Sequence, residues 1–332
     1  MKKYILNETP VRTSNNYKIN DITLELDIPT INSFDNYKVE GIEYKEYDTN
    51  SFTSKIGLSF TKSHNLDIDV LESKDIFISY KTKDILVSTI NINLNKESIS
   101  NIIIKLESYT NAFNSIKLVI NGFISSKSKI ILLNMIDNSS KSFIAIEKNL
   151  DDSSNVDINF IDLGGSIRVS NYYASVSNLA RSSFNNIYIG NDEDRIDMNY
   201  YVKNQGIKSE SYIDVRGALN GKSYKTFKGT VDFIEGSKKS IGKEKENTIL
   251  LSNNAISRSL PMLLCHEEDV IGSHGVSSGK IDSEKLFYIM SRGITESEAK
   301  KLIIKSSFDE IINRITNEEI KEEVTNIIDS KI

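Results

Sequence analysis

Short strand-like runs recur at nearly even spacing through the second half of this 332-residue chain. The runs are rich in Ile, Val and Tyr, polar residues separate them, and one begins about every dozen residues. They span residues 157–163, 167–170, 186–189, 196–201, 211–215, 225–231 and 248–251. Such a period is typical of an antiparallel sandwich built from hairpins, or of a β-solenoid whose coils stack on one another.

Hairpin turn signals are scarce, and this decides between the two architectures. Asn121-Gly122 and Asn220-Gly221 are the only Asn-Gly pairs in the chain, and Asp-Gly does not occur. A sandwich would use such pairs often, because both central residues of its tight turns need a left-handed backbone. The sequence therefore favours the β-solenoid. Dense strand signals continue back to about residue 73, with residues 138–149 left ambiguous.

The pattern changes at Asp282, where helical signals replace strand signals. Asp282 or Ser283 can cap a helix that Gly293 ends, and residues 295–298 form a capping box for the next helix. We therefore predict a β-solenoid core over 71–281 and a helical domain over 282–332. Residues 1–70 are expected to be irregular with short strands, of which 22–28 is the clearest.

Composition excludes several functional classes. The chain has 41 Lys and Arg against 46 Asp and Glu, a net charge of −5, which lacks the basic footprint of a nucleic-acid-binding protein. Its single cysteine, Cys265, permits no internal disulfide, and the apolar run 263–265 predicts a buried, inert thiol. The N-terminus does not read as a signal peptide and no apolar run is long enough to cross a membrane, so we expect a cytoplasmic protein.

His274 is the candidate for chemistry, because it lies between glycines in the segment 272–275, Gly-Ser-His-Gly. Glycines let other backbone approach closely and leave an imidazole accessible, which suits a metal ligand or a proton carrier. The alternative is an ordinary turn histidine. No phosphate-binding loop, nucleophile elbow or zinc-protease motif occurs in the chain.

Several segments taken together resemble the SufB/SufD family, the scaffold components of the SUF iron–sulfur cluster assembly system. The matching segments are residues 9–13, 216–223, 227–229, 247–252, 272–275, 279–282, 286–294 and 296–299. The resemblance implies a right-handed parallel β-helix followed by a small helical domain, in agreement with the solenoid reading.

The resemblance also implies partners. A SufD-like chain would pair with a SufB-like paralogue through the β-helices, and its helical domain would dock a SufC-like ABC-type ATPase. ATP-driven motion of the ATPase would then expose an assembly site at the interface. Residues expected at the docking surface are Phe287, Arg292, Gly293, Ile294 and Phe308. Phe287, Ile289 and Met290 have an alternative place in the core of the helical domain.

The site residues implied by the resemblance point to SufD rather than to SufB. Glu246 stands where SufB has a functional cysteine, whereas His274 matches the histidine of the SufD sequence motif Cys-Ser-His-Gly. His274 is thus a candidate ligand for iron or a nascent cluster at a subunit interface, since histidine replaces cysteine in some clusters. Glu246 could add a hard oxygen ligand, or be a plain surface carboxylate. No cofactor is expected to stay bound to the chain alone; iron or a cluster would be carried transiently by the complex.

Two other functions remain open at this point. A homodimeric scaffold would use the same surface symmetrically, although one cysteine per chain equips it poorly to hold a cluster. A carbohydrate-active β-helix enzyme is the other alternative, disfavoured by the absence of tryptophan and of a recognisable signal peptide.

Overall fold

The computed structural model describes residues 2–12, 19–26, 33–43, 45–49, 52–53, 59–60 and 63–332. The predicted strand 22–28 is β2 (Ile22–Leu26), and its last two positions lie outside the described residues. The other strands that precede residue 74 are β1 (Lys2–Leu6), β3 (Ser33–Glu40), β4 (Lys45–Thr49), β5 (Phe52–Thr53), β6 (Ser59–Phe60) and β7 (Ser63–Val70).

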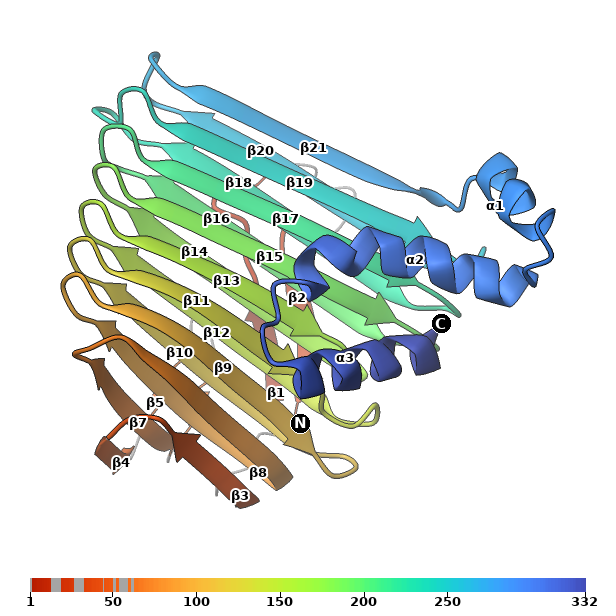
Figure 1. Cartoon of the computed structure of the whole chain (residues 1–332), viewed down its shortest axis with the longest axis horizontal. Coiled ribbons are helices and arrows are strands. Elements are labelled where there is room, and N and C mark those ends of the chain that lie inside the picture. Colours follow the sequence, from red (N-terminus) through yellow and green to blue (C-terminus); the bar gives the residue numbers. More distant parts are fainter. Residues whose placement is uncertain are drawn as a thin grey trace.

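Two long parallel sheets form a β-helix (Figure 1). One sheet, called here the back sheet, contains β10 (Phe113–Gly122), β12 (Lys141–Leu150), β14 (Ile167–Val176), β16 (Arg195–Asn204), β18 (Tyr224–Phe233) and β20 (Ile256–Cys265). The other, the front sheet, contains β9 (Ile99–Ser108), β11 (Lys127–Asn134), β13 (Asn155–Asp162), β15 (Arg181–Gly190), β17 (Glu210–Leu219), β19 (Ile241–Leu250) and β21 (Ile271–Lys280).

Each coil contributes one strand to each sheet, so every strand pairs with the strand two places later in the chain. At the start of the stack, β7 pairs in parallel with the second half of the long strand β8 (Lys74–Leu94). The first half of β8 then pairs with β9 and its second half with β10. Equivalent residues in successive coils stack, as where Asn134 Nδ2 donates to the Asp162 carboxylate 28 residues later at 2.7 Å. The predicted parallel β-solenoid is confirmed, and the ambiguous segment 138–149 contains most of strand β12.

The turns that lead from the back sheet to the front sheet repeat one hydrogen bond. In each, a residue with a left-handed backbone donates its amide N–H to a carbonyl oxygen of the next coil. Each bond satisfies a backbone donor and holds neighbouring coils in register. These residues are Glu97, Ser125, Ser153, Leu179, Lys208 and Lys239.

Alternation along the strands places apolar side chains between the sheets. The early coils are filled with Ile, Leu and Val, whereas aromatic rings occupy the later coils. Tyr172 and Phe184 stack with ring centroids 4.1 Å apart, and Phe184 meets Tyr200 edge-on at 4.8 Å. The continuous interior row explains why such a polar chain still builds a long core.

Buried cations also lie within the β-helix. Lys148 donates to the carbonyl oxygens of Val156 at 3.0 Å and Ser183 at 3.1 Å, and burial lowers the pKa of Lys148 to about 7. Arg168 is only 2% exposed and donates to the carbonyls of Asp162 and Ile189. Arg168 also pairs with Asp194 at 3.2 Å, so carbonyl oxygens and a carboxylate together supply the partners that these buried groups need.

Three helices follow the β-helix. Asp282 caps α1 (Ser283–Met290), Thr295 forms a capping box with Glu298 at the start of α2 (Glu296–Ile312), and Asn317 caps α3 (Glu318–Lys331). Helices α2 and α3 lie across the front sheet, whereas α1 lies beyond its edge (Figure 1). Among the described residues, no helix is both long and apolar enough to span a membrane.

Each outer face of the β-helix has an apolar cover. On the front sheet, Phe308, Ile311 and Val324 of α2 and α3 pack against a stripe that includes Leu133 and Ile187. On the back sheet, Leu6, Ile22 and Leu24 of the β1–β2 hairpin pack on Val87, Phe113, Phe143 and Val169.

Candidate functional site

The β-helix ends at an uncovered coil made of β20 and β21, which we call the open end. Strand β20 pairs only with β18, and β21 only with β19, within the described part of the chain. All residues of β21 are exposed, in contrast to the largely buried strands of the preceding coils. One edge of each strand therefore presents backbone groups to solvent, the arrangement on which another strand can pair.

His274 belongs to the row of β21 side chains that points along the interior of the stack. Strands β19 and β21 pair in parallel with His274 opposite Glu244, and residues paired in this way share a face of the sheet. Glu244 is buried, so this shared face is the interior one. His274 is nevertheless exposed because no further coil covers it, and it forms no hydrogen bond with any described residue. The imidazole is therefore free to bind a group supplied from outside the chain.

Glu244, in the coil beneath His274, was not singled out from the sequence. It is 3% exposed, and neither carboxylate oxygen has a hydrogen-bond partner among the described residues. Burial, together with the charge of Glu246, raises the pKa of Glu244 to about 8. Gly229 makes room for it, since a Cβ at Gly229 would lie 2.2 Å from Oε1 of Glu244. At neutral pH the Glu244 carboxyl group therefore carries a proton.

Glu246 is neither a surface carboxylate nor a free ligand, which corrects the expectation from sequence. It is 1% exposed and forms a buried ion pair with Lys225. Its oxygens also accept hydrogen bonds from Thr248 Oγ1 at 2.9 Å and from Ser259 Oγ at 2.5 Å. Its lone pairs are thus engaged inside the β-helix, and Glu244 is the carboxyl group that lies in register with His274.

Cys265 corrects a second expectation, because it is exposed rather than buried. It ends strand β20 and pairs with Phe233 of β18, whose ring is buried in the interior. Cys265 thus shares with His274 the uncovered interior side of the last coil. Among the described residues, no three His, Cys, Asp or Glu side chains are grouped to hold a metal ion.

The residues expected to dock a partner separate into two groups. Phe308 is fully buried between α2 and the front sheet, so it cannot contribute to a docking surface. Phe287 is 72% exposed, Arg292 and Gly293 are also exposed, and Ile294 is half-buried.

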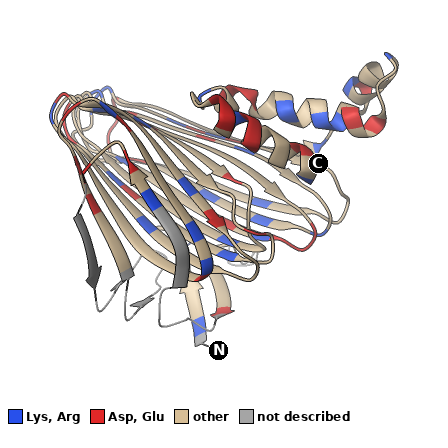
Figure 2. Cartoon of the chain, turned by 60° about the horizontal axis from the view of Figure 1, so that its bottom comes forward, with Lys and Arg blue, Asp and Glu red and all other residues tan. Residues whose placement is uncertain are grey.

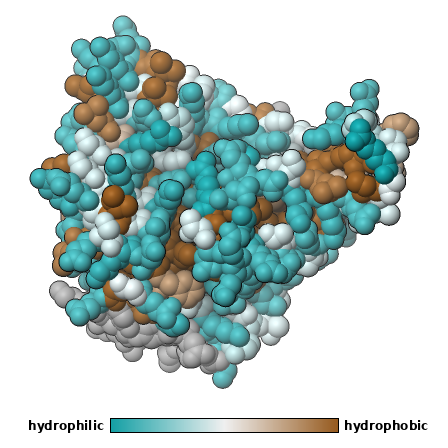
Figure 3. Space-filling view, in the orientation of Figure 1, coloured by the Kyte–Doolittle hydropathy of each residue, from teal (hydrophilic) through white to brown (hydrophobic). Residues whose placement is uncertain are grey.

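Helix α1 has no buried residue, so the alternative that Phe287, Ile289 and Met290 form a helical core is wrong. Apolar side chains instead gather on the surface at α1 (Figure 3). Arg292 lies over the Tyr288 ring, 4.6 Å from its centroid, and Gly293 has a left-handed backbone with φ of 89° that redirects the chain after the helix.

Comparison with known proteins relates this chain to iron–sulfur cluster assembly. A family described as "SUF system FeS cluster assembly, SufBD core domain" matches residues 77–307. The iron–sulfur cluster assembly protein SufD of Bacillus subtilis is 28% identical over 146 residues, which cover 44% of this chain and 33% of that protein. SufD of Escherichia coli is 30% identical over 106 residues, which cover 32% of this chain and 25% of that protein.

A SufBD family protein of Mycobacterium bovis is 33% identical over 90 residues, covering 27% of this chain and 23% of that protein. The aligned part thus spans about a quarter to a third of each of these relatives. The family match covers most of the β-helix and continues into the helices, and both proteins named SufD lie among the relatives. The chain belongs to the SufBD core family and is most like SufD.

Proposed function

We propose that this chain is a non-catalytic, SufD-like scaffold subunit of an iron–sulfur cluster assembly complex. The observation that carries the proposal is the open end, where His274 stands exposed on an edge strand of the last coil. A cysteine-bearing SufB-like paralogue would pair with this end. The nascent cluster or its iron, as the cargo of the complex, would be held between His274 and thiolates of the paralogue.

The backbone of the open end supports strand pairing. Both β20 and β21 are ten residues long and have a free edge, and main-chain hydrogen bonds along such an edge give affinity without a preformed pocket. Leu263 and Val276 add partly exposed apolar surface on the same coil. Covering this surface would bring a second chain against His274.

The helical segment supports docking of a SufC-like ATPase. Phe287, Tyr288 and Met290 on α1 are 72%, 57% and 37% exposed, and Leu302 on α2 is 49% exposed. An apolar group of this kind on a helix that contributes nothing to the core is typical of an interaction site. Helix α2 is fixed to the β-helix by Phe308, so force applied at α1 would reach the coils.

Co-purification from cells that also produce a SufB-like paralogue and a SufC-like ATPase tests both interfaces. Wild-type chain should recover both partners. Val276→Asp, which places a charge at the open end, should lose the paralogue but keep the ATPase. The double variant Phe287→Ala/Met290→Ala should lose the ATPase but keep the paralogue. Recovery of only a second copy of this chain would contradict the heteromeric complex and favour the homodimeric scaffold.

A further inference from the structure

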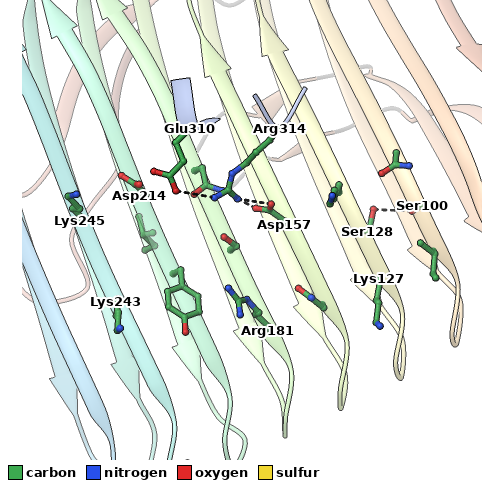
Figure 4. A pocket seen from close by; sticks show the side chains of 18 residues that line it. Ser100, Lys127, Ser128, Asp157, Arg181, Asp214, Lys243, Lys245, Glu310 and Arg314 are labelled. Carbon is green, nitrogen blue, oxygen red and sulfur yellow. Dashed lines mark hydrogen bonds and ion pairs between the residues drawn. The ribbon is translucent and has the colours of Figure 1, made fainter. Parts of the chain in front are cut away.

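A groove lies on the outer face of the front sheet, beside the C-terminal end of α2. It has a volume of about 690 Å³, and strands from β9 to β19 form its floor (Figure 4). Glu310 of α2 and Arg314, which follows the helix, contribute to its wall. Its cationic side chains are Lys127, Lys129, Arg181, Lys243, Lys245 and Arg314.

The carboxylates of the groove are all engaged with arginines. Asp157 pairs with Arg314 at 2.9 Å, and Arg314 lies 3.6 Å from Glu310 (Figure 4). Arg216, next to the groove, pairs with both Asp214 and Glu310. These contacts fix the end of α2 to the sheet and neutralise the acidic groups of the groove.

The four lysines of the groove are different, because none forms an ion pair with a described carboxylate. Lys127 and Lys129 on β11 and Lys243 and Lys245 on β19 are all exposed. Between them, Arg181 lies 4.7 Å from the centroid of the Tyr212 ring and pairs with Glu210 at 3.3 Å. In Figure 2 the ribbon positions of Lys and Arg, drawn in blue, fall on several adjacent strands of the β-helix. In a chain with a net charge of −5, the four lysines alone are thus a local concentration of positive charge without an ion pair among the described residues.

The spacing of the lysines indicates the shape of the ligand. Strands β13, β15 and β17 lie between β11 and β19, and adjacent strands are about 4.8 Å apart. The two lysine pairs are therefore separated by about 19 Å, the length of roughly six extended residues. A single phosphate or carboxylate cannot contact both pairs.

We propose that this groove binds an extended acidic segment of a partner protein that runs across the strands from β11 to β19. Carboxylates near the two ends of the segment would contact Lys127 with Lys129 and Lys243 with Lys245. Asn155, exposed on β13 between them, offers hydrogen bonds to its backbone. The groove lies on the outer face of the front sheet and includes no residue of β20, β21 or α1, so its lining differs from that of the two proposed interfaces of the complex.

Fluorescence anisotropy with a labelled deca-glutamate peptide tests the proposal on the full chain. The wild type should bind the peptide, and binding should weaken as salt is raised. Lys127→Glu/Lys129→Glu and Lys243→Glu/Lys245→Glu should each weaken binding at least tenfold, because an extended ligand reaches both pairs. The matched control Lys208→Glu/Lys238→Glu, with the same change of net charge at exposed turn positions, should bind as the wild type does.

Other outcomes would overturn the proposal. Equal peptide affinity in the wild type and in both groove variants would exclude the groove as the binding surface. Loss confined to one lysine pair, with ATP competing as effectively as the peptide, would indicate a compact anion. Equal loss in the control variant would indicate attraction by net charge alone, and tighter binding of an oligo-dT probe than of the peptide would indicate a nucleic-acid surface.

Discussion

His274 and Glu244 occupy the same interior row of the β-helix, one coil apart, because β19 and β21 pair with these two residues opposite each other. The imidazole is exposed at the open end, while the carboxyl group beneath it is buried without a partner among the described residues. A ligand bound at the histidine would thus lie next to a protonated acid, which can release its proton when a metal cation approaches.

Replacing His274 with alanine should abolish cluster formation on the co-expressed complex and leave its assembly intact. The imidazole is exposed and makes no described hydrogen bond, so its removal should cost the fold little. Iron and acid-labile sulfide in the purified complex measure the effect. His266→Ala is the matched control, since His266 is also exposed, at 63%, and faces Asp232. Normal cluster content in the His274 variant would remove this residue from the mechanism.

Replacing Glu244 with glutamine should stabilise the chain at pH 8. The native pKa of Glu244 is about 8, against 4.5 for an ordinary Glu, so the native state retains a proton that the unfolded chain has lost. Wild-type stability should therefore fall as pH rises from about 4.5 to about 8. Glutamine has no such titration, and its advantage at pH 8 should be on the order of 4 kcal/mol.

Chemical unfolding of both proteins at several pH values measures this difference. The gap in unfolding free energy between the glutamine variant and the wild type should widen steadily between pH 5 and pH 8. A gap that does not change with pH would contradict a protonated Glu244.

Cys265 should react with a maleimide in the native chain about as fast as in the denatured chain, because the thiol is exposed. Binding of a paralogue at the open end should slow the reaction. Mass spectrometry of samples quenched at successive times follows both rates. A native thiol that reacts only after denaturant is added would show that the last coil is covered.

Phe308 and Phe287 should respond in opposite ways to replacement by alanine. Phe308 is fully buried beneath α2, so Phe308→Ala should lower the unfolding free energy by about 3–5 kcal/mol. Phe287 is 72% exposed, and Phe287→Ala should change the unfolding free energy by less than about 0.5 kcal/mol. Denaturant titration measures both values. Equal destabilisation by the two variants would show that α1 packs against the rest of the chain.

The regular part of the fold could be predicted from sequence, because the strands repeat at a nearly constant spacing and the turns lack hairpin signals. The helix starts were also readable, since Thr295 and Glu298 form the capping box that their spacing predicts. Helix α1 was different: its apolar residues predict a packed face, but packing depends on what lies opposite. Helix α1 contacts α2, yet none of its residues is buried.

The charged interior could not be predicted in the same way. Glu246 was expected to be an iron ligand or a surface carboxylate, because a charged residue rarely enters a core unless it is paired. The sequence does not show that Lys225 is its partner. One local signal was present: Lys243, Glu244, Lys245 and Glu246 alternate in charge. A strand period of two puts the glutamates on one side and the lysines on the other, as the structure has them.

The prediction that Cys265 is buried was wrong for a reason that concerns the whole stack of coils. An apolar run predicts burial only if the next coil is there to cover it, and β20 and β21 form the last coil. The local sequence of a strand does not indicate whether its coil is the last one of the stack.

Most contacts of a coil are with its two neighbours, although Tyr188 reaches over Gly217 to Thr248 two coils along, where the two hydroxyl oxygens lie 2.7 Å apart. Protection of backbone amides against hydrogen exchange should therefore decline toward Lys280, at the uncovered end of the stack. Another polypeptide that pairs with this end would act as one more coil and slow exchange in the coils beneath it. The number of coils in which exchange slows would measure how strongly neighbouring coils stabilise one another.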